Sequence, residues 1–189
     1  LLQMRQEFTY PQATAVFCSP LRRCTQTAQL LYPGANPIIL DGLKEYFFGD
    51  FENKTPVELE NHPVFSRWIA GENGLAPPFG EDPADFQRRI CATFKKLCDG
   101  LLKTGTAHSV VVTHGGVLMA LLAAFGLPAA PMHEWLTPAG TGFVLRLEPT
   151  IWLRGQKCEV FALAPTAPKE DALPEERRLW KELEDTEYL

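Results

Sequence analysis

Two apolar, β-branched segments of this chain lead directly into helices through turns of polar residues. The first, residues 14–18, is followed by Ser-Pro-Leu-Arg-Arg, and the second, residues 109–113, is followed by His-Gly-Gly. A strand that passes at once into a helix is typical of a parallel sheet covered by helices. In such folds ligands bind beyond the carboxyl ends of the strands, so these two turns are the first candidates for a functional site.

The rest of the chain continues this alternation. Ser19 is predicted to cap a helix over residues 21–31, with Pro20 at its first position. Further strands are expected at residues 37–40, 141–147 and 158–163, and further helices at residues 55–69, at residues 82–102 and from His114 to Gly126, whereas residues 41–54 resemble a loop. We therefore predict an α/β fold, a three-layer α/β/α sandwich with a mainly parallel sheet.

Length and charge limit the domain organisation and the partners. We predict one α/β domain over residues 1–167 and an acidic helical tail over residues 168–189. The net charge is −5, and residues 170–189 carry all of this excess with eight acidic and three basic residues. The remaining chain has no basic surplus, so no nucleic acid is expected as a partner. The longest apolar run is too short to cross a membrane, and five cysteines without a CxxC pair favour a cytoplasmic location.

His114 lies where a predicted buried strand passes into a helix. The two glycines that follow it let a ligand approach the backbone, and the N–H groups at the start of a helix attract anions. An imidazole at this place could donate to a phosphoryl oxygen or transfer protons. The alternative is a histidine that only caps the helix.

Arg22 and Arg23 fall in the first turn of a predicted helix, where a cation opposes the helix dipole. This placement indicates a bound anion nearby, because the planar guanidinium suits phosphate. The alternative is a pair of solvated surface arginines.

Glu45 precedes the aromatic stretch Tyr46-Phe47-Phe48. A carboxyl group desolvated by such neighbours could serve as a general acid, although an exposed glutamate is the commoner case. The other histidines have no Cys or acidic partners at the spacing of a metal site, so no metal and no other cofactor is predicted.

Two segments resemble parts of the histidine phosphatase superfamily, whose fold is phosphoglycerate-mutase-like. Residues 18–28, Cys-Ser-Pro-Leu-Arg-Arg-Cys-Thr-Gln-Thr-Ala, are similar to the family element with a phosphate-binding arginine, which falls on Arg23. Residues 43–52 are similar to the segment that supplies the proton donor, which falls on Glu45.

Two further segments follow in family order. Gly80-Glu81 resembles a Gly-Glu-Ser loop in which Asp82 replaces the serine. Residues 112–116, Val-Thr-His-Gly-Gly, resemble the segment of a catalytic histidine, which falls on His114. The resemblance runs from residue 14 to residue 164 with family spacing, which makes it more specific than any one segment.

The resemblance implies a metal-independent phosphomonoester hydrolase that acts on a small-molecule phosphate ester through a phosphohistidine. His114 would stabilise the transferring phosphoryl group, Arg23 would neutralise its oxygens, and Glu45 would protonate the leaving oxygen. Gly115 and Glu81 are expected to bind substrate together with Arg23. Within the family, the short connection between residues 51 and 80 favours a phosphatase over a mutase. Residues 49–55, Gly-Asp-Phe-Glu-Asn-Lys-Thr, resemble most closely the branch of α-ribazole phosphatases and broad-specificity phosphatases.

The family's nucleophilic histidine lies in an Arg-His-Gly motif on the first strand, and this sequence contains no such motif. We therefore expect the nucleophile and the first strand upstream of Leu1, and the printed chain alone to be inactive. Two alternatives stay open: an inactive relative that binds phosphate esters, and a phosphotransferase of the phosphoglycerate mutase type. The acidic tail could dock on the domain or on the partner in a homodimer; the alternative is a frayed acidic terminus.

Overall fold

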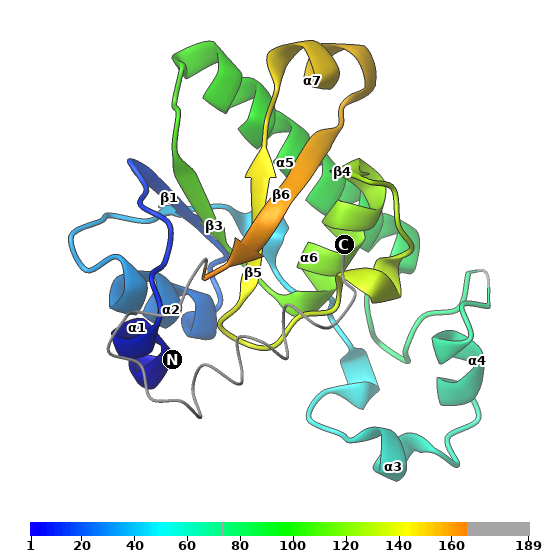
Figure 1. The fold of residues 1–189 in the computed structure, drawn as a ribbon. Helices are drawn as coiled ribbons and strands as arrows, with labels where there is room; N and C mark the ends of the chain where they lie inside the picture. The colour runs from blue at the N-terminus through cyan, green and yellow to red at the C-terminus, as the bar shows by residue number, and fades with distance from the viewer. Residues whose placement is uncertain (73, 166–189) are drawn as a thin grey trace.

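The computed structural model describes residues 1–72 and 74–165, so the predicted tail over residues 168–189 lies outside the described residues. Helices separate the strands along the chain, and several helices in succession connect β2 to β3 (Figure 1). The strands are β1 (Ala15–Cys18), β2 (Ile38–Ile39), β3 (Ser109–Val112), β4 (Gly126–Leu127), β5 (Gly142–Arg146) and β6 (Cys158–Ala164). The α-helices are α1 (Leu2–Glu7), α2 (Arg22–Leu31), α3 (Pro56–Leu59), α4 (Phe65–Ile69), α5 (Pro83–Thr104), α6 (Gly115–Phe125) and α7 (Pro149–Gly155). Short 3₁₀ helices are η1 (Asp41–Leu43), η2 (Gly49–Phe51) and η3 (Met132–Trp135).

The described strands form two three-stranded sheets. One has the order β2-β1-β3 and is parallel throughout; in the other, β6 lies between β4, to which it is parallel, and β5, to which it is antiparallel. The predicted α/β class with mainly parallel strands is confirmed, although the strands divide into two sheets. Both β3 and β5 are edge strands, and Val111 of β3 and Leu145 of β5 pack against the same hydrophobic core.

Two cores on opposite faces of β3 give the layers. Val111 packs against the core formed largely by α5 and α6, whereas its neighbour Val112 packs with Cys24 and Ala28 of α2. Because successive side chains of a strand point to opposite faces, α2 covers one face of β3 and α5 with α6 covers the other. The predicted α/β/α layering is therefore present around the first sheet.

The long helix α5 begins and ends where its sequence indicates. The Asp82 side chain accepts hydrogen bonds from the backbone N–H groups of Ala84 and Asp85, Pro83 occupies the first position, and Gly105 ends the helix at φ 65°. Its buried residues recur every three or four positions: Phe86, Ile90, Phe94, Leu97 and Cys98. This stripe fixes α5 beside η1, where the chain towards the candidate site begins.

Three local predictions differ from the structure. The helix expected over residues 55–69 is divided into α3 and α4, because Pro63 disfavours helical backbone at the residue before it. The predicted cap at Thr55 is present. Ser19 does not cap α2, which begins at Arg22 with Leu21 as its N-cap. Strand β3 is half-buried rather than buried, because it lies at a sheet edge.

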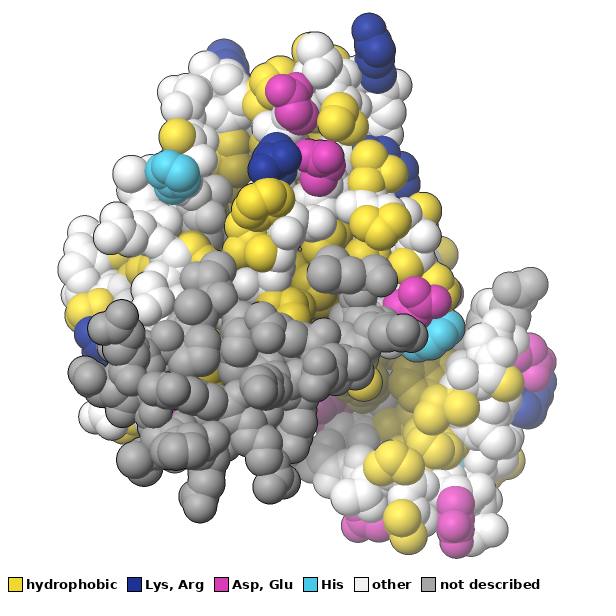
Figure 2. All heavy atoms as spheres, viewed as in Figure 1, with side chains coloured by type: hydrophobic (Ala, Val, Ile, Leu, Met, Phe, Trp, Pro, Cys, Tyr) yellow, Lys and Arg dark blue, Asp and Glu magenta, His cyan; other side chains and the backbone are white. Residues whose placement is uncertain are grey.

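The surface seen in Figure 2 mixes both signs of charge. On the part of this face that the described residues form, Lys and Arg side chains are scattered among Asp and Glu side chains, without a continuous basic area. Within residues 1–72 and 74–165, no helix is long and apolar enough to span a membrane.

Candidate active site

The two turns singled out in the sequence lie next to each other, at the carboxyl ends of the neighbouring strands β1 and β3. Cys18 at the end of β1 pairs with Val112 at the end of β3, and the Ser19 N–H donates to the Val112 carbonyl over 2.9 Å. The parallel register therefore places the start of α2, with Arg23, next to the start of α6, with His114. The structure therefore brings together, at the carboxyl ends of β1 and β3, the two turns that the sequence predicts as one site.

His114 is held by hydrogen bonds at both ring nitrogens. Arg23 Nε donates to Nδ1 over 2.9 Å, and Ser19 Oγ lies 2.7 Å from Nε2. A guanidinium only donates, so Nδ1 must be unprotonated, and Nε2 carries the hydrogen and donates it to Ser19. Burial, followed by the charges of Arg23 and Arg89, lowers the pKa of His114 to about 4. The imidazole is therefore neutral near pH 7.

Cys24 packs against the same ring. Its Sγ lies 3.6 Å from Nδ1 and 3.5 Å from Nε2 of His114, and it donates to the Thr113 carbonyl over 3.2 Å. Burial is the main reason that the pKa of this thiol rises to about 11, so it stays protonated. The thiol is a packing contact that restricts the imidazole ring.

Glu45 reaches the start of α6 from the other side. Its Oε2 accepts from the Gly116 N–H over 3.1 Å, and its Oε1 accepts from the Tyr46 N–H over 2.9 Å. A Cβ on Gly116 would lie 2.6 Å from Oε1, so only glycine admits the carboxylate at this distance. A Cβ on Gly115 would meet nothing within 4 Å. The structure thus brings Arg23, Glu45 and His114 together around the first turn of α6.

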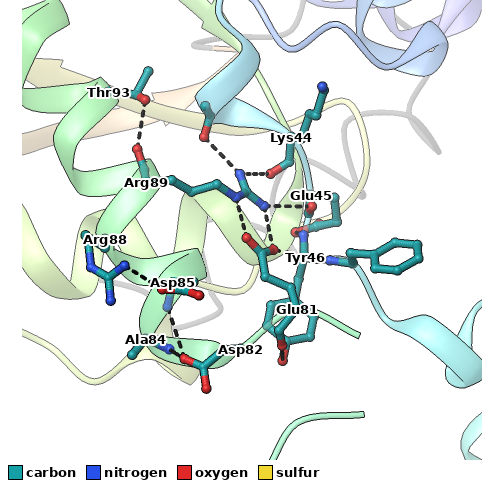
Figure 3. Close-up of polar contacts among 12 residues, drawn as sticks. Lys44, Glu45, Tyr46, Glu81, Asp82, Ala84, Asp85, Arg88, Arg89 and Thr93 are labelled. Atoms are coloured by element: carbon teal, nitrogen blue, oxygen red, sulfur yellow. Dashed lines mark hydrogen bonds and ion pairs between the residues drawn. The ribbon is translucent and has the colours of Figure 1, made fainter. Parts of the chain in front are cut away.

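Arg89 of α5 fixes the segment that carries Glu45 (Figure 3). Its guanidinium binds Glu81 through Nε to Oε1 at 2.6 Å and through Nη2 to Oε2 at 2.8 Å. The same group donates to the backbone carbonyls of Gly42, Lys44 and Glu45 over 2.7 to 3.0 Å. Glu81, predicted to bind substrate, therefore contacts Arg89 in an ion pair and acts here on the shape of the loop.

A cleft of about 750 Å³ opens beside these residues. It is lined by Leu21, Arg23, Asp41, Lys44, Glu45, Tyr46, Phe47, Phe48, Glu52, Glu81 and Arg89. Arg23 and Glu45 line the cleft, whereas His114 and Gly115 do not. His114 lies behind Arg23, to which it is hydrogen-bonded. No group of three metal-ligating side chains occurs in the part of the chain that the structure describes.

The sequence interpretation missed Ser19 and Arg89. Ser19 was assigned to a helix cap, although a serine directly at the end of a parallel strand also lies at the ligand-binding edge. Arg89 lies beside the apolar stripe of α5, between Phe86 and Ile90, and an arginine at the border of such a stripe becomes half-buried with its head free to reach polar partners. That position was the available signal.

The family assignment rests on most of the chain. Residues 3–151 match the family model of the histidine phosphatase superfamily (branch 1), so the chain belongs to this superfamily. The resemblance inferred from four short segments is confirmed. Comparison with curated protein sequences gives no match.

Solved structures show the same fold. The alpha-ribazole phosphatase from Shigella flexneri matches with a TM-score of 0.71 and 22% identity, covering 90% of this chain and 83% of that chain. The phosphoglycerate mutase from Thermus thermophilus matches with a TM-score of 0.50 and 30% identity, covering 69% of this chain and 66% of that chain. A mycobacterial glucosyl-3-phosphoglycerate phosphatase matches with a TM-score of 0.50 and 27% identity, covering 65% of this chain and 60% of that chain.

Proposed function

We propose that this chain hydrolyses phosphate monoesters through a phosphohistidine intermediate, with the nucleophilic histidine on a segment upstream of Leu1. The observation that carries the proposal is the grouping of Arg23, Glu45 and neutral His114 at the first turn of α6. A cation, an N–H donor and the N-terminus of a helix are the groups that bind a phosphoryl anion. Membership of the histidine phosphatase superfamily and two solved relatives named as phosphatases support hydrolysis.

In the first step a histidine nitrogen attacks phosphorus, and the bond from phosphorus to the ester oxygen breaks. Arg23 would bind the phosphoryl oxygens, where charge is spread in the transition state, and His114 would join it by turning its Nε2–H from Ser19 to a phosphoryl oxygen. The Glu45 carboxyl would give a proton to the leaving oxygen. Water then attacks phosphorus, returns a proton to Glu45 and releases phosphate from the histidine.

The strand topology supports a nucleophile on an additional strand. β3 and β5 are both edge strands, and residues of both pack on one core. A strand that paired in parallel with β3 would end at the same sheet edge as β3, beside His114. Such a strand would also pair with the free backbone groups of the valine-rich edge strand β3, which a stable fold rarely leaves unpaired.

The test compares the natively expressed gene product with two histidine variants. His114→Ala is expected to reduce kcat for p-nitrophenyl phosphate by about 10³-fold, because it removes a donor to the transferring group. His108→Ala changes an exposed histidine before β3 and is expected to keep wild-type turnover. Brief reaction with ³²P-labelled ester should leave an acid-labile label on a histidine. Equal turnover in His114→Ala and wild type would contradict the role of His114, and tight phosphate binding without any label would favour the inactive phosphate-ester-binding relative.

Glu45→Gln tests the proton donor. The amide keeps the size of the side chain but has no proton to give at catalytic rates, so esters with poor leaving groups should suffer more. We expect kcat for ethyl phosphate to fall at least about tenfold further than kcat for p-nitrophenyl phosphate, which needs little protonation. Glu52→Gln changes another carboxylate of the same cleft and should lower both substrates alike, if at all. Equal losses for the two esters in Glu45→Gln would show that Glu45 is not the acid.

A further inference from the structure

The Glu45 side chain lies on a segment without regular structure. Its two oxygens accept from backbone donors, the Tyr46 N–H and the Gly116 N–H. Residues 44–48, between η1 and η2, form no helix or strand, so no regular element sets the position of this carboxylate. A general acid must lie within hydrogen-bond reach of the leaving oxygen, and a displacement of about 1 Å can cost about 10²-fold in rate. Contacts to other parts of the chain must therefore fix Glu45.

One side chain of α5 supplies these contacts (Figure 3). Arg89 Nη1 donates to the carbonyls of Gly42 and Lys44 over 2.9 and 2.7 Å. Its Nη2 donates to the carbonyl of Glu45 itself over 3.0 Å. The planar guanidinium holds its donors in a fixed geometry, so the three carbonyls are fixed relative to α5. A Cβ on Gly42 would overlap Thr93 Oγ1 of the same helix, so this segment passes α5 at a distance that only glycine allows.

Glu81 connects the same guanidinium to the residues that follow Glu45. Its carboxylate accepts from Arg89 Nε over 2.6 Å and from Nη2 over 2.8 Å, and the two side chains are only 16% and 26% exposed. The Glu81 carbonyl accepts from the Tyr46 hydroxyl, and the Glu81 N–H donates to the Phe47 carbonyl over 2.8 Å. The chain is therefore held before Glu45 by Arg89 and after it by Glu81.

Arg89 lines the cleft, but its hydrogen-bond donors are all used within the chain. A guanidinium carries five N–H groups, one on Nε and two on each Nη. Nε binds Glu81, Nη1 binds two carbonyls, and Nη2 binds the Glu45 carbonyl and Glu81. All of these partners lie within residues 42–81. Because no N–H group is left for a substrate, Arg89 shapes the cleft and does not bind in it.

We propose that Arg89, together with Glu81, is a positioning residue for the proton transfer by Glu45. The pair holds the Glu45 carboxyl at the distance from the leaving oxygen that the transfer needs, without contacting the substrate. The proposal rests on the proposed function, in which Glu45 is the proton donor. Loss of the pair should therefore slow most strongly the esters that need a proton on the leaving oxygen, whereas a purely structural role would slow all esters alike.

The first experiment measures Arg89→Lys in the natively expressed gene product with ethyl phosphate and p-nitrophenyl phosphate. Lysine keeps the charge but not the planar set of donors. We expect kcat for ethyl phosphate to fall at least about tenfold further than kcat for p-nitrophenyl phosphate, with both KM values within about twofold of wild type. Both esters are measured on one preparation, so the ratio of their kcat values does not depend on the folded fraction. Arg88→Lys changes the exposed neighbour on α5 and should keep the wild-type ratio.

Two further variants test whether the effect passes through Glu45. Glu81→Gln leaves Arg89 in place but breaks the bidentate pair, so the ratio of ethyl phosphate to p-nitrophenyl phosphate turnover should fall by about threefold or more. Arg89→Lys combined with Glu45→Gln should give the ratio of Glu45→Gln alone within about twofold, because the proton donor is already absent. Additive losses in the double variant, or an unchanged ratio in both Arg89→Lys and Glu81→Gln, would overturn the proposal.

Hydrogen exchange at the Gly116 amide separates this proposal from the proposed function. This N–H donates to the Glu45 carboxylate, so its exchange should become at least about tenfold faster in Arg89→Lys, relative to the Leu118 amide within α6, and stay unchanged in Arg88→Lys. If neither ester is hydrolysed but Gly116 responds in this way, the proposed hydrolysis fails and the positioning of Glu45 by Arg89 stands. If both esters are hydrolysed while neither the kcat ratio nor the Gly116 exchange changes in Arg89→Lys, the positioning role is overturned and the hydrolase remains.

Discussion

The two halves of the candidate site are held in different ways. The half around His114 is built from the ends of β1 and β3 and the starts of α2 and α6, and its residues Ser19, Cys24 and His114 are buried. The half around Glu45 belongs to residues 41–81, where the helices are short and the backbone is mostly irregular. There, one arginine from α5 binds three backbone carbonyls and one carboxylate.

This difference shows two routes to a fixed side chain. Regular elements place His114 by sheet register and by packing on a continuous core, so its position is fixed by many contacts. In the Glu45 half, Leu43 and Tyr46 also pack into the core, but the backbone that carries Glu45 is irregular and is held by the hydrogen bonds of one side chain, Arg89. We therefore expect the Glu45 half to be sensitive to substitution of Arg89, a residue that is not proposed to contact the reacting groups.

Arg89→Met should produce the largest effect on stability. It leaves the Glu81 carboxylate and the carbonyls of Gly42, Lys44 and Glu45 without their charged donor. Hydrogen bonds to charged groups contribute roughly 1.5–3 kcal/mol, and removing Arg89 leaves the Glu81 carboxylate half-buried without its partner. We therefore expect the free energy of unfolding to fall by about 3 kcal/mol. Urea unfolding at pH 7 measures it.

Arg88→Met is the matched control for this prediction. Arg88 is the neighbouring residue on α5, and its pair with Asp85 is exposed at 74% and 57% of the two side chains. Exposed pairs contribute about 0 to 1 kcal/mol, so this variant should unfold close to the wild type. A similar small loss in both variants would mean that Arg89 does not hold the Glu45 half, and the contrast between the two halves would disappear.

The same contrast explains what the sequence predicts and what it does not. The Arg23 and His114 turns follow directly from local patterns, because a strand, a turn and a helix start within ten residues define where these side chains lie. The contacts of Arg89 join residues more than forty positions apart and depend on how α5 packs beside η1. A local sequence pattern says nothing about residues so far apart. The sequence therefore predicts the loop of Glu45 but not the hydrogen bonds from Arg89 that hold it.

The division of the strands into two sheets was missed for a related reason. The sequence predicts strands from apolar runs, and these runs do not state which strand lies beside which. Ile38 and Ile39 show the limit: the sequence predicts a strand there, which the structure has as β2, but it does not say that these side chains are 51% and 48% exposed at the edge of the first sheet. Apolar character indicates strand residues here, but pairing decides burial.

The buried half should respond to pH through His114. Its pKa is about 4 in the folded chain and near 6.5 when unfolded, so between these values the unfolded chain binds more protons. Stability from this group is therefore complete above about pH 6.5 and is lost as the pH falls towards 4, by an amount of the order of 3 kcal/mol. Urea unfolding of wild type and His114→Gln at pH 7 and pH 4.5 measures the difference.

In that comparison the wild type should lose more free energy of unfolding on acidification than His114→Gln, because the variant has no imidazole at this position. His108→Gln removes an exposed histidine and should retain the wild-type response. Parallel losses in wild type and His114→Gln would contradict a neutral, buried imidazole and would leave no difference in pH response to assign to the buried half.

The smallest expected effect lies at Gly116, where the two halves meet. Alanine is favoured over glycine in a helix by about 1 kcal/mol, so Gly115→Ala, whose Cβ would enter open space, should raise the free energy of unfolding by up to that amount. Gly116→Ala gains the same helix preference but places a Cβ 2.6 Å from Glu45 Oε1, which forces the carboxylate off the Gly116 N–H. The loss of that charged hydrogen bond offsets the gain, so Gly116→Ala should unfold about 1 kcal/mol or more below Gly115→Ala. Equal stabilisation of the two variants in urea would place the Glu45 carboxylate away from α6, and the hydrogen bond from Thr113 Oγ1 to the Leu43 carbonyl would remain as a link between the two halves.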